Sequence, residues 1–147
     1  MIHIIKSITD SLFGLLSEDP VRPEIPFVER IGDNKDVFVL RENDKTMAIT
    51  CVSYQDFVPE AEQELFNTTN TPTVAVFYTI WSYAPGSGRQ LIFDAVEHIK
   101  ENRKEIDRFV TLSPKTETAK RFHLRNGAII FRENEKTVNF EYIKVRL

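Results

Sequence analysis

The feature of this sequence that most narrows its fold is a strand–helix–strand succession between residues 73 and 112. Residues 73–81 are almost all apolar, which is typical of a strand buried on both faces. After the turn 84–89, apolar residues recur at the spacing of one helix face, at Leu91, Ile92, Ala95, Val96 and Ile99. Residues 108–112 then form a second strand pattern. Two strands joined through a helix pair in parallel with a right-handed crossover, so this segment predicts a central parallel pair.

The remaining patterns surround this crossover with antiparallel strands and further helices. Strands are expected over residues 2–4, 37–40, 47–53, 128–131 and 138–145. Helices are expected over residues 7–16 and 27–31, from Pro59 within the acidic stretch 56–64, and from Ser113-Pro114 to a stop at Asn126-Gly127. The predicted fold is therefore α/β (α+β): a mixed, mostly antiparallel sheet with a central parallel β-α-β crossover and flanking helices, forming one domain over residues 1–147.

Composition excludes several classes of protein. The 147 residues are 41% hydrophobic, which is enough for one buried core. With 19 basic and 22 acidic residues the net charge is −3, so nucleic-acid binding is not expected. The lone Cys51 forms no intrachain disulfide, and no run approaches the roughly 20 apolar residues of a membrane span. We expect a protein of the cytoplasm that lies outside membranes. The three histidines and the cysteine lack metal-ligand spacing, so no metal is expected.

The turn before the predicted central helix has the composition of an anion site. Gly86 and Gly88 allow the backbone to approach a phosphate closely, and Arg89 adds a positive charge at the helix start. The sequence lacks the Lys-Ser/Thr pair of a Walker A loop and the third glycine of a dinucleotide fingerprint. An ordinary strand-to-helix turn is the alternative interpretation.

This turn and the order of elements together resemble the GNAT superfamily of acyl-CoA N-acyltransferases. The family's pyrophosphate loop follows the pattern Gln/Arg-x-x-Gly-x-Gly/Ala, and residues 83–88 lie on it with Tyr83 in the first position and Pro85 in the third. A second family signature, Asn-x-x-Ala-x-x-hydrophobic-Tyr followed by Gly-Phe, falls on residues 116–128. Its matches are Ala119, Phe122 and Gly127, and its departures are Thr116, His123 and Ala128.

The resemblance implies a binding site for acetyl-CoA. Carried over by position, Gly86, Ser87, Gly88 and Arg89 hold the pyrophosphate. Backbone groups of Tyr78 and Ile80 meet the pantetheine, and Ser113 lies at the opposite lip of the cleft. His123 takes the place of the tyrosine that protonates the departing thiolate in the family. It can serve as an imidazolium, or as a neutral ring that hydrogen-bonds the sulfur; the alternative is a buried helix residue without a chemical role.

Other ionisable residues leave alternatives open. Residues 73–82 contain no carboxylate, so the family's usual base is missing there. The acidic residues Asp56, Glu60, Glu62 and Glu64 either supply a base and attract a cationic acceptor or form a solvated face. Cys51 forms a nucleophilic set with His123 or is a small buried hydrophobe. Four basic residues at the second signature face the phosphates of CoA or the solvent: Lys115, Lys120, Arg121 and Arg125.

The predicted function is an acetyl-CoA-dependent N-acetyltransferase that acts on an amine of an unknown acceptor. The departures at Tyr83, Pro85, His123 and Ala128 support an alternative, a catalytically inactive protein that keeps this fold for a structural or partner-binding role. A further alternative is an acyltransferase that takes its acyl group from another thioester, such as acyl carrier protein. The strands within residues 128–147 could pair with the same strands of a second copy, which would form a homodimer.

Overall fold

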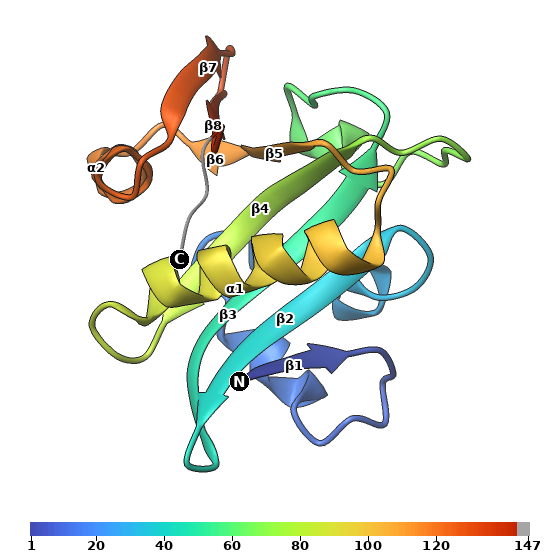
Figure 1. Cartoon of the computed structure of the whole chain (residues 1–147), viewed down its shortest axis with the longest axis vertical. Helices are drawn as coiled ribbons and strands as arrows, with labels where there is room; N and C mark the ends of the chain where they lie inside the picture. Colours follow the sequence, from blue (N-terminus) through green and yellow to red (C-terminus); the bar gives the residue numbers. More distant parts are fainter. Residues whose placement is uncertain (144–147) are drawn as a thin grey trace.

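The computed structural model describes residues 1–143, which build a mixed eight-stranded sheet (Figure 1). The strand order is β1-β2-β3-β4-β5-β8-β6, with β7 paired to β8. The strands are β1 (Ile2–Ile5), β2 (Lys35–Glu42), β3 (Lys45–Gln55), β4 (Val74–Ser82), β5 (Arg108–Thr111), β6 (Ser113–Pro114), β7 (Ile129–Glu133) and β8 (Thr137–Glu141). The helices are α1 (Ser87–Asn102) and α2 (Glu117–Arg125), with three short 3-10 helices, η1 (Phe13–Glu18), η2 (Phe27–Arg30) and η3 (Glu62–Glu64).

The predicted parallel crossover is confirmed. β4 and β5 pair in parallel from Val74 opposite Arg108 to Phe77 opposite Thr111, and α1 connects them. The other paired strands run antiparallel. The mixed, mostly antiparallel sheet expected from the sequence is therefore present.

The sheet separates two apolar cores. Helix α1 lies across one face, as Figure 1 shows, and its Leu91, Val96 and Ile99 pack there with residues such as Phe38 and Phe77. The opposite face is covered by the segment that contains η1 and η2, which contributes Leu16 and Ile25 to the second core. The middle of β2, most of β3 and nearly all of β4 are buried, which explains the almost uniformly apolar sequence of β4. Within residues 1–143, no helix combines the length and apolar character needed to cross a membrane.

The prediction of a helix over residues 7–16 is wrong. Turns occupy the first part of this segment, and the short η1 begins only at Phe13. The Asp10 carboxylate accepts hydrogen bonds from the backbone N–H of Leu12 at 2.8 Å and lies 2.8 Å from His3 Nε2. Such side-chain to backbone bonds compete with helical ones, so the segment folds as turns. The expected short helix near residue 27 is present as η2, with 3-10 geometry.

The prediction of a helix through the acidic stretch is also wrong, since only Glu62–Glu64 form a short η3. The carbonyls that a helix would use are taken by side chains of the C-terminal hairpin. Arg132 Nη2 donates to Val58 O at 2.7 Å, Asn139 Nδ2 to Pro59 O at 2.9 Å, and Thr137 Oγ1 to Glu60 O at 2.6 Å. These partners lie more than 70 residues away in sequence, so local pattern could not reveal them.

Ser113 and Pro114 do not start a helix, contrary to expectation. They form β6, where Ser113 lies opposite Val138 and Pro114 opposite Thr137. Helix α2 begins at Glu117, capped by the Thr116 side chain, which accepts from Ala119 N at 3.2 Å. The helix stop is as predicted, with Gly127 at φ +97°. The last predicted strand ends at Glu141, and residues 144–145 of that prediction lie outside the described residues.

Candidate functional site

The two parallel strands diverge after their fourth residue pair, and we call this divergence the splay. The last bond between them runs from Leu112 N to Phe77 O at 3.0 Å. Beyond it, β4 continues to Ser82 beside β3, whereas the chain after β5 turns to β6 and pairs with β8. β4 also bulges here, because Val52 lies opposite Phe77 and Cys51 lies opposite Thr79, which leaves Tyr78 as the extra residue. The sheet is therefore open along the C-terminal half of β4.

A cleft of about 250 Å³ occupies the opening. Its floor comes from β4, one wall from the start of α1, and the other wall from β6 and α2. Six of the residues that line the cleft are Tyr78, Ile80, Gly88, Ser113, Phe122 and His123. The structure thus brings together five predicted site residues from four segments of the chain.

Backbone groups of β4 face this cleft. The carbonyl of Thr79 accepts from Thr50 Oγ1 on the β3 side at 2.8 Å. Successive residues of a strand turn their N–H and C=O groups to opposite edges, so those of Ile80 face the side that β5 has left. The carbonyl of Tyr78 is already bonded to Arg22. Ser113, predicted at the opposite lip, is buried there, and its Oγ lies 2.8 Å from Thr111 Oγ1.

The turn before α1 has the geometry of an anion site in its backbone. Gly86 caps the helix at φ +79°, a left-handed conformation that glycine adopts without strain. The backbone N–H groups of Gly88 and Arg89 make no hydrogen bond among the described residues, so both remain free at the helix N-terminus. The Ser87 hydroxyl is engaged inward, 2.9 Å from Met47 O and 2.6 Å from Ala84 O. The backbone N–H of Ser87 also donates to Ala84 O, at 3.3 Å, so this residue offers no free donor at the turn.

Close packing favours glycine at position 88. A Cβ atom there would lie 3.0 Å from Cε1 of Phe122, so the Phe122 ring would have to shift by a few tenths of an ångström to admit it. The neighbouring Arg89 is exposed, with its guanidinium 4.5 Å from the Phe93 ring centroid. Its Nη1 donates to Asn126 Oδ1 at 3.2 Å, which holds the positive charge between the two helices.

His123 lies in the wall of the cleft and is almost completely buried. Its ring stacks on Phe140, with 5.1 Å between centroids, and meets Phe122 edge-on at 5.1 Å. Burial lowers the pKa of His123 to about 4. The ring is therefore neutral near pH 7, which favours the expected neutral hydrogen-bond donor over an imidazolium.

Sequence reasoning missed two residues of the site, and Tyr142 is the first. Its hydroxyl lies 2.7 Å from Nδ1 of His123, and both side chains are buried. Burial raises the pKa of Tyr142, so the phenol keeps its proton at neutral pH. The sequence signal was only that Val138, Phe140 and Tyr142 alternate on one strand face.

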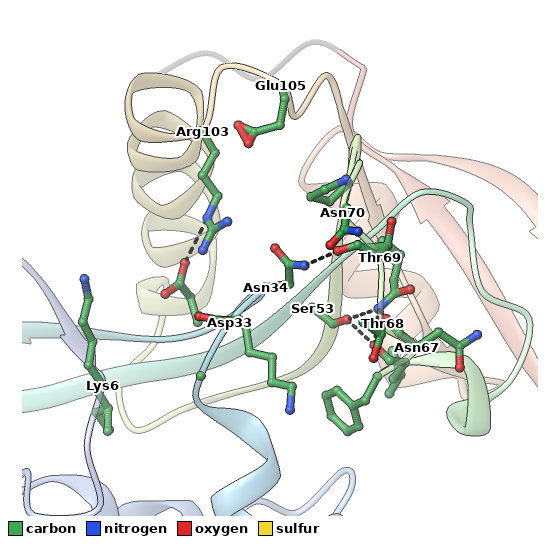
Figure 2. A pocket seen from close by; sticks show the side chains of 18 residues that line it. Lys6, Asp33, Asn34, Ser53, Asn67, Thr68, Thr69, Asn70, Arg103 and Glu105 are labelled. Carbon is green, nitrogen blue, oxygen red and sulfur yellow. Dashed lines mark hydrogen bonds and ion pairs between the residues drawn. The ribbon is translucent and has the colours of Figure 1, made fainter.

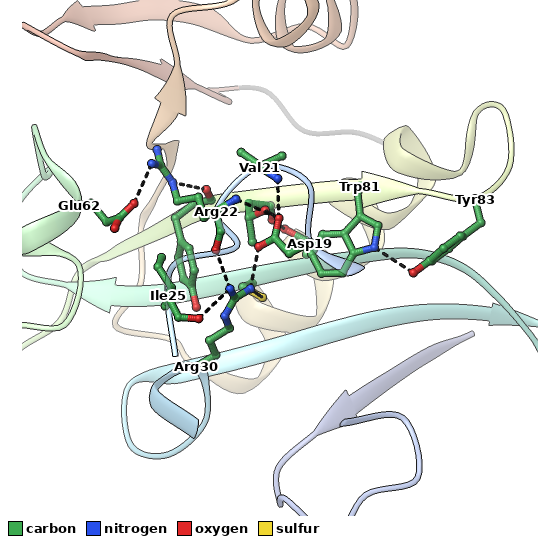
Figure 3. A network of polar contacts seen from close by, with 12 residues as sticks. Asp19, Val21, Arg22, Ile25, Arg30, Glu62, Trp81 and Tyr83 are labelled. Carbon is green, nitrogen blue, oxygen red and sulfur yellow. Dashed lines mark hydrogen bonds and ion pairs between the residues drawn. The ribbon is translucent and has the colours of Figure 1, made fainter. Parts of the chain in front are cut away.

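Arg22 is the second missed residue, because the proline-rich segment around it predicts only an irregular link. Its Nε donates to Tyr78 O and its Nη2 to Leu112 O, both at 2.9 Å, so one guanidinium spans the splay (Figure 3). Its Nη1 donates to Glu62 at 3.0 Å. Arg30, fully buried and paired with Asp19 at 2.7 Å, donates to the Arg22 carbonyl at 2.7 Å and so anchors this segment.

The acidic residues predicted to supply a base have separate environments. Glu62 reaches the splay through Arg22, and burial together with the adjacent Glu24 carboxyl raises the Glu62 pKa. Glu64 accepts from backbone N–H groups of Glu60 and Ala61. Asp56 accepts from Thr69 Oγ1 at 3.2 Å. Among the four, Glu62 is therefore the candidate for chemistry at the splay.

Of the two interpretations of Cys51, the structure supports the small buried hydrophobe and not the nucleophilic set with His123. Cys51 belongs to the core on the opposite face, where Arg30 lies 3.8 Å from its sulfur. Burial raises the pKa of the Cys51 thiol to about 12, so it is not a nucleophile at neutral pH. The four basic residues around α2 are exposed, which leaves both of their predicted roles open.

A second concavity, larger and polar, lies at the other end of the sheet (Figure 2). This groove of about 930 Å³ runs between residues 32–36 and 65–70, with Arg103 and Glu105 beside it. Asn34 Nδ2 donates to Thr69 O at 2.9 Å and joins the two loops. The groove contains none of the predicted site residues, so the cleft at the splay is the candidate active site.

Comparison with known proteins identifies related folds at low sequence identity. The GNAT domain of S. lividans PAT is 12% identical with a TM-score of 0.65, over 96% of this chain and 88% of that chain. A Bacillus subtilis acetyltransferase in complex with CoA is 14% identical with a TM-score of 0.61, over 95% and 93%. Malonyl-CoA decarboxylase from Agrobacterium vitis is 20% identical with a TM-score of 0.66, over 86% of this chain and 36% of that chain. The present chain thus matches only about a third of the decarboxylase. No family model and no curated protein matches the sequence.

Proposed function

We propose that this chain, whose fold is that of the GNAT acetyltransferases, is an acyl-CoA-dependent N-acyltransferase that transfers an acetyl group to an amine. The observation that carries the proposal is the cleft at the splay, which joins an open strand edge to a helix N-terminus with two free N–H groups. An open strand edge suits the amide groups of pantetheine, and a helix N-terminus suits a pyrophosphate. The solved B. subtilis acetyltransferase, which has the same fold, is a complex with CoA.

The residues at the cleft fit acetyl-CoA. The pyrophosphate would be held by the turn Gly86–Arg89, chiefly through the free N–H groups of Gly88 and Arg89 and the Arg89 charge. Ile80 would meet the pantetheine with its backbone, while the Tyr78 carbonyl is committed to Arg22. Ser113 would close the opposite lip. Gly88 has no side chain to fill the narrow space beside Phe122.

Two side chains would serve the transfer. When bound, acetyl-CoA supplies a thioester whose acyl group is open to attack by a neutral amine. His123 would offer its ring N–H as a hydrogen-bond donor to the sulfur. Glu62, with its raised pKa, would accept a proton from the amine on the other side of the splay. An acidic residue at that place also suits a cationic acceptor, as the sequence suggested.

An inactive protein with a partner-binding role is the alternative, and specific contacts support it. Tyr83, in place of the family's Gln or Arg, directs its hydroxyl to Glu18 and Trp81 rather than to the turn. Pro85 has no N–H to offer a phosphate. Both departures reduce the number of hydrogen-bond donors at the turn. An acyltransferase should bind CoA, whereas an inactive partner-binding protein should not.

Calorimetric titration with acetyl-CoA tests the proposal. We expect a micromolar dissociation constant for the wild type, and a loss of at least tenfold in Arg89→Glu because the charge at the helix start is reversed. Lys104→Glu is the matched control, since it reverses an exposed charge beyond the far end of α1 and should leave affinity within about twofold. No binding at millimolar acetyl-CoA would contradict the proposal. If the protein transferred an acyl group from acyl carrier protein but not from CoA, acyl carrier protein would be the donor.

A homodimer is supported by β7, an outer strand whose Ile129, Ile130 and Phe131 are all exposed. Residues 144–147 of the predicted interface lie outside the described residues. Light scattering of the wild type and of Ile130→Glu tests for the dimer, and equal monomer masses for both proteins would contradict it.

A location in the cytoplasm accords with the free thiol of Cys51.

A further inference from the structure

His123 and Tyr142 lie 19 residues apart in sequence and meet inside the apolar wall of the cleft. The two rings have exposed fractions of 4% and 3%. Phe140 stacks on the imidazole, and Phe122 meets it edge-on, so the ring has little freedom to turn. Its Nδ1 is bonded to the Tyr142 hydroxyl, and its Nε2 has no hydrogen-bond partner among the described residues.

The proton on the imidazole has two possible positions. A neutral histidine carries one N–H and one bare nitrogen, and the partner of one nitrogen decides the state of the other. If the phenol donates to Nδ1, the imidazole proton is on Nε2. If Nδ1–H donates to the phenol oxygen, Nε2 is bare and the phenol proton needs another acceptor.

The surroundings of Tyr142 favour the first arrangement. Within residues 1–143, His123 is the one hydrogen-bond partner of the Tyr142 hydroxyl. A phenol proton directed elsewhere would therefore be buried without an acceptor, which is costly in an apolar environment. The charged group that acts on this pair is Arg89, whose positive charge opposes the effect of burial on the Tyr142 pKa but does not remove it. The phenol thus remains a donor at neutral pH.

We propose that Tyr142 is a positioning residue that fixes His123 in the Nε2–H tautomer, so that the cleft presents a neutral N–H donor to the sulfur of a bound thioester. The tautomer depends only on contacts within this chain. The contact with a thioester sulfur rests on the proposed function. A tyrosine that directly follows β8 would thereby orient a donor supplied by α2.

The test is ¹⁵N NMR of protein labelled at its histidine rings, with the His123 signals assigned by their loss in His123→Asn. At pH 7 the wild type should show a protonated Nε2 and a bare Nδ1. Tyr142→Phe keeps the ring but removes the donor, so the Nε2–H preference should fall and both tautomers should appear. Tyr54→Phe is the matched control, because Tyr54 is also buried and bonded, but to Asp36. It should leave the His123 signals unchanged.

Each part of the proposal has its own contrary result. A wild-type ring with the proton on Nδ1, or an unchanged tautomer in Tyr142→Phe, would overturn the role of Tyr142. Addition of CoA, used here as a thiol probe, should shift both the Gly88 amide signal and the His123 Nε2 signal. A shift at Gly88 without one at Nε2 would overturn the contact with sulfur. No shift at Gly88 would instead count against the proposed function, while the tautomer result would stand.

Discussion

The guanidinium of Arg22 donates its Nε proton to the carbonyl of Tyr78 at 2.9 Å, at the bulge where β4 loses its parallel neighbour. The same side chain donates from Nη2 to Leu112 O at 2.9 Å, on the chain that turns away. Separating two paired strands leaves carbonyl groups without partners, and buried carbonyls without partners are destabilising. Arg22 satisfies one carbonyl on each side, so the N-terminal segment stabilises the open form of the sheet.

Arg22→Met should therefore lower the free energy of unfolding by about 2–4 kcal/mol, because two carbonyls lose their donor. Urea unfolding measures this change. Arg121→Met, which removes an exposed arginine, is the control and should change stability by less than about 0.5 kcal/mol. If Arg22→Met were as stable as the control, Arg22 would not support the splay.

Gly88→Ala should weaken acetyl-CoA binding by at least tenfold. The new Cβ would lie 3.0 Å from Phe122 Cε1, so the ring must move, and Phe122 lines the cleft. Titration calorimetry measures the affinity, and adding Phe122→Leu to Gly88→Ala should restore part of it. Gly14→Ala is the control, because a Cβ at Gly14 meets no atom within 4 Å. Full affinity in Gly88→Ala would show that the cleft does not hold the cofactor.

His123 should make the protein less stable in mild acid. In the unfolded chain its pKa is about 6.5, whereas burial lowers the folded value to about 4. Between these values the unfolded state binds more protons, so stability falls as the pH falls. The loss from this residue is about 2 kcal/mol between pH 7 and pH 5.

Urea unfolding at these two pH values measures the loss from His123. His123→Phe should reduce the pH dependence by that amount, since phenylalanine does not titrate. His98→Gln should retain it. An identical pH dependence in His123→Phe and the wild type would mean that the folded protein protonates His123 as readily as the unfolded chain does.

Glu62→Gln should lower kcat for acetyl transfer by about 10²-fold while leaving the KM for acetyl-CoA unchanged. The glutamine oxygen can still accept from Arg22, so the contact at the splay is kept while the base is lost. Glu60→Gln is the control, because Glu60 is an exposed acid two residues away. Comparison of initial rates from acid to neutral pH should show that the rise in kcat with pH, displaced upward by the raised pKa of Glu62, disappears only in Glu62→Gln. Equal rates in both variants would exclude Glu62 as the base.

Local pattern was sufficient for the centre of the fold. The apolar run of β4, the helical spacing of α1 and the glycines between them each depend on neighbours within a few residues. The glycine turn before α1 could be predicted for the same reason, since the φ of +79° at Gly86 is a local property of the backbone. A cleft between Ile80 and Ser113 was also expected, but only through the family resemblance.

The failed helix predictions show where local pattern is insufficient. At Asp10 a side chain competes for a backbone N–H that a helix would use. At Val58 and Pro59 the competition comes from Arg132 and Asn139, 74 and 80 residues away. Apolar spacing and charge reveal neither type of competition.

The sequence by itself determined the parallel crossover and the glycine turn, because these follow from side-chain periodicity and backbone freedom. Only the tertiary structure decided that Arg22 spans the splay and that Tyr142 meets His123. Arg22 bonds carbonyls 56 and 90 residues away, and the hydroxyl of Tyr142, just after β8, pairs with His123 on α2, 19 residues away. Buried polar groups take whichever partners the packed chain brings within about 3 Å, and that choice exists only after the chain has folded.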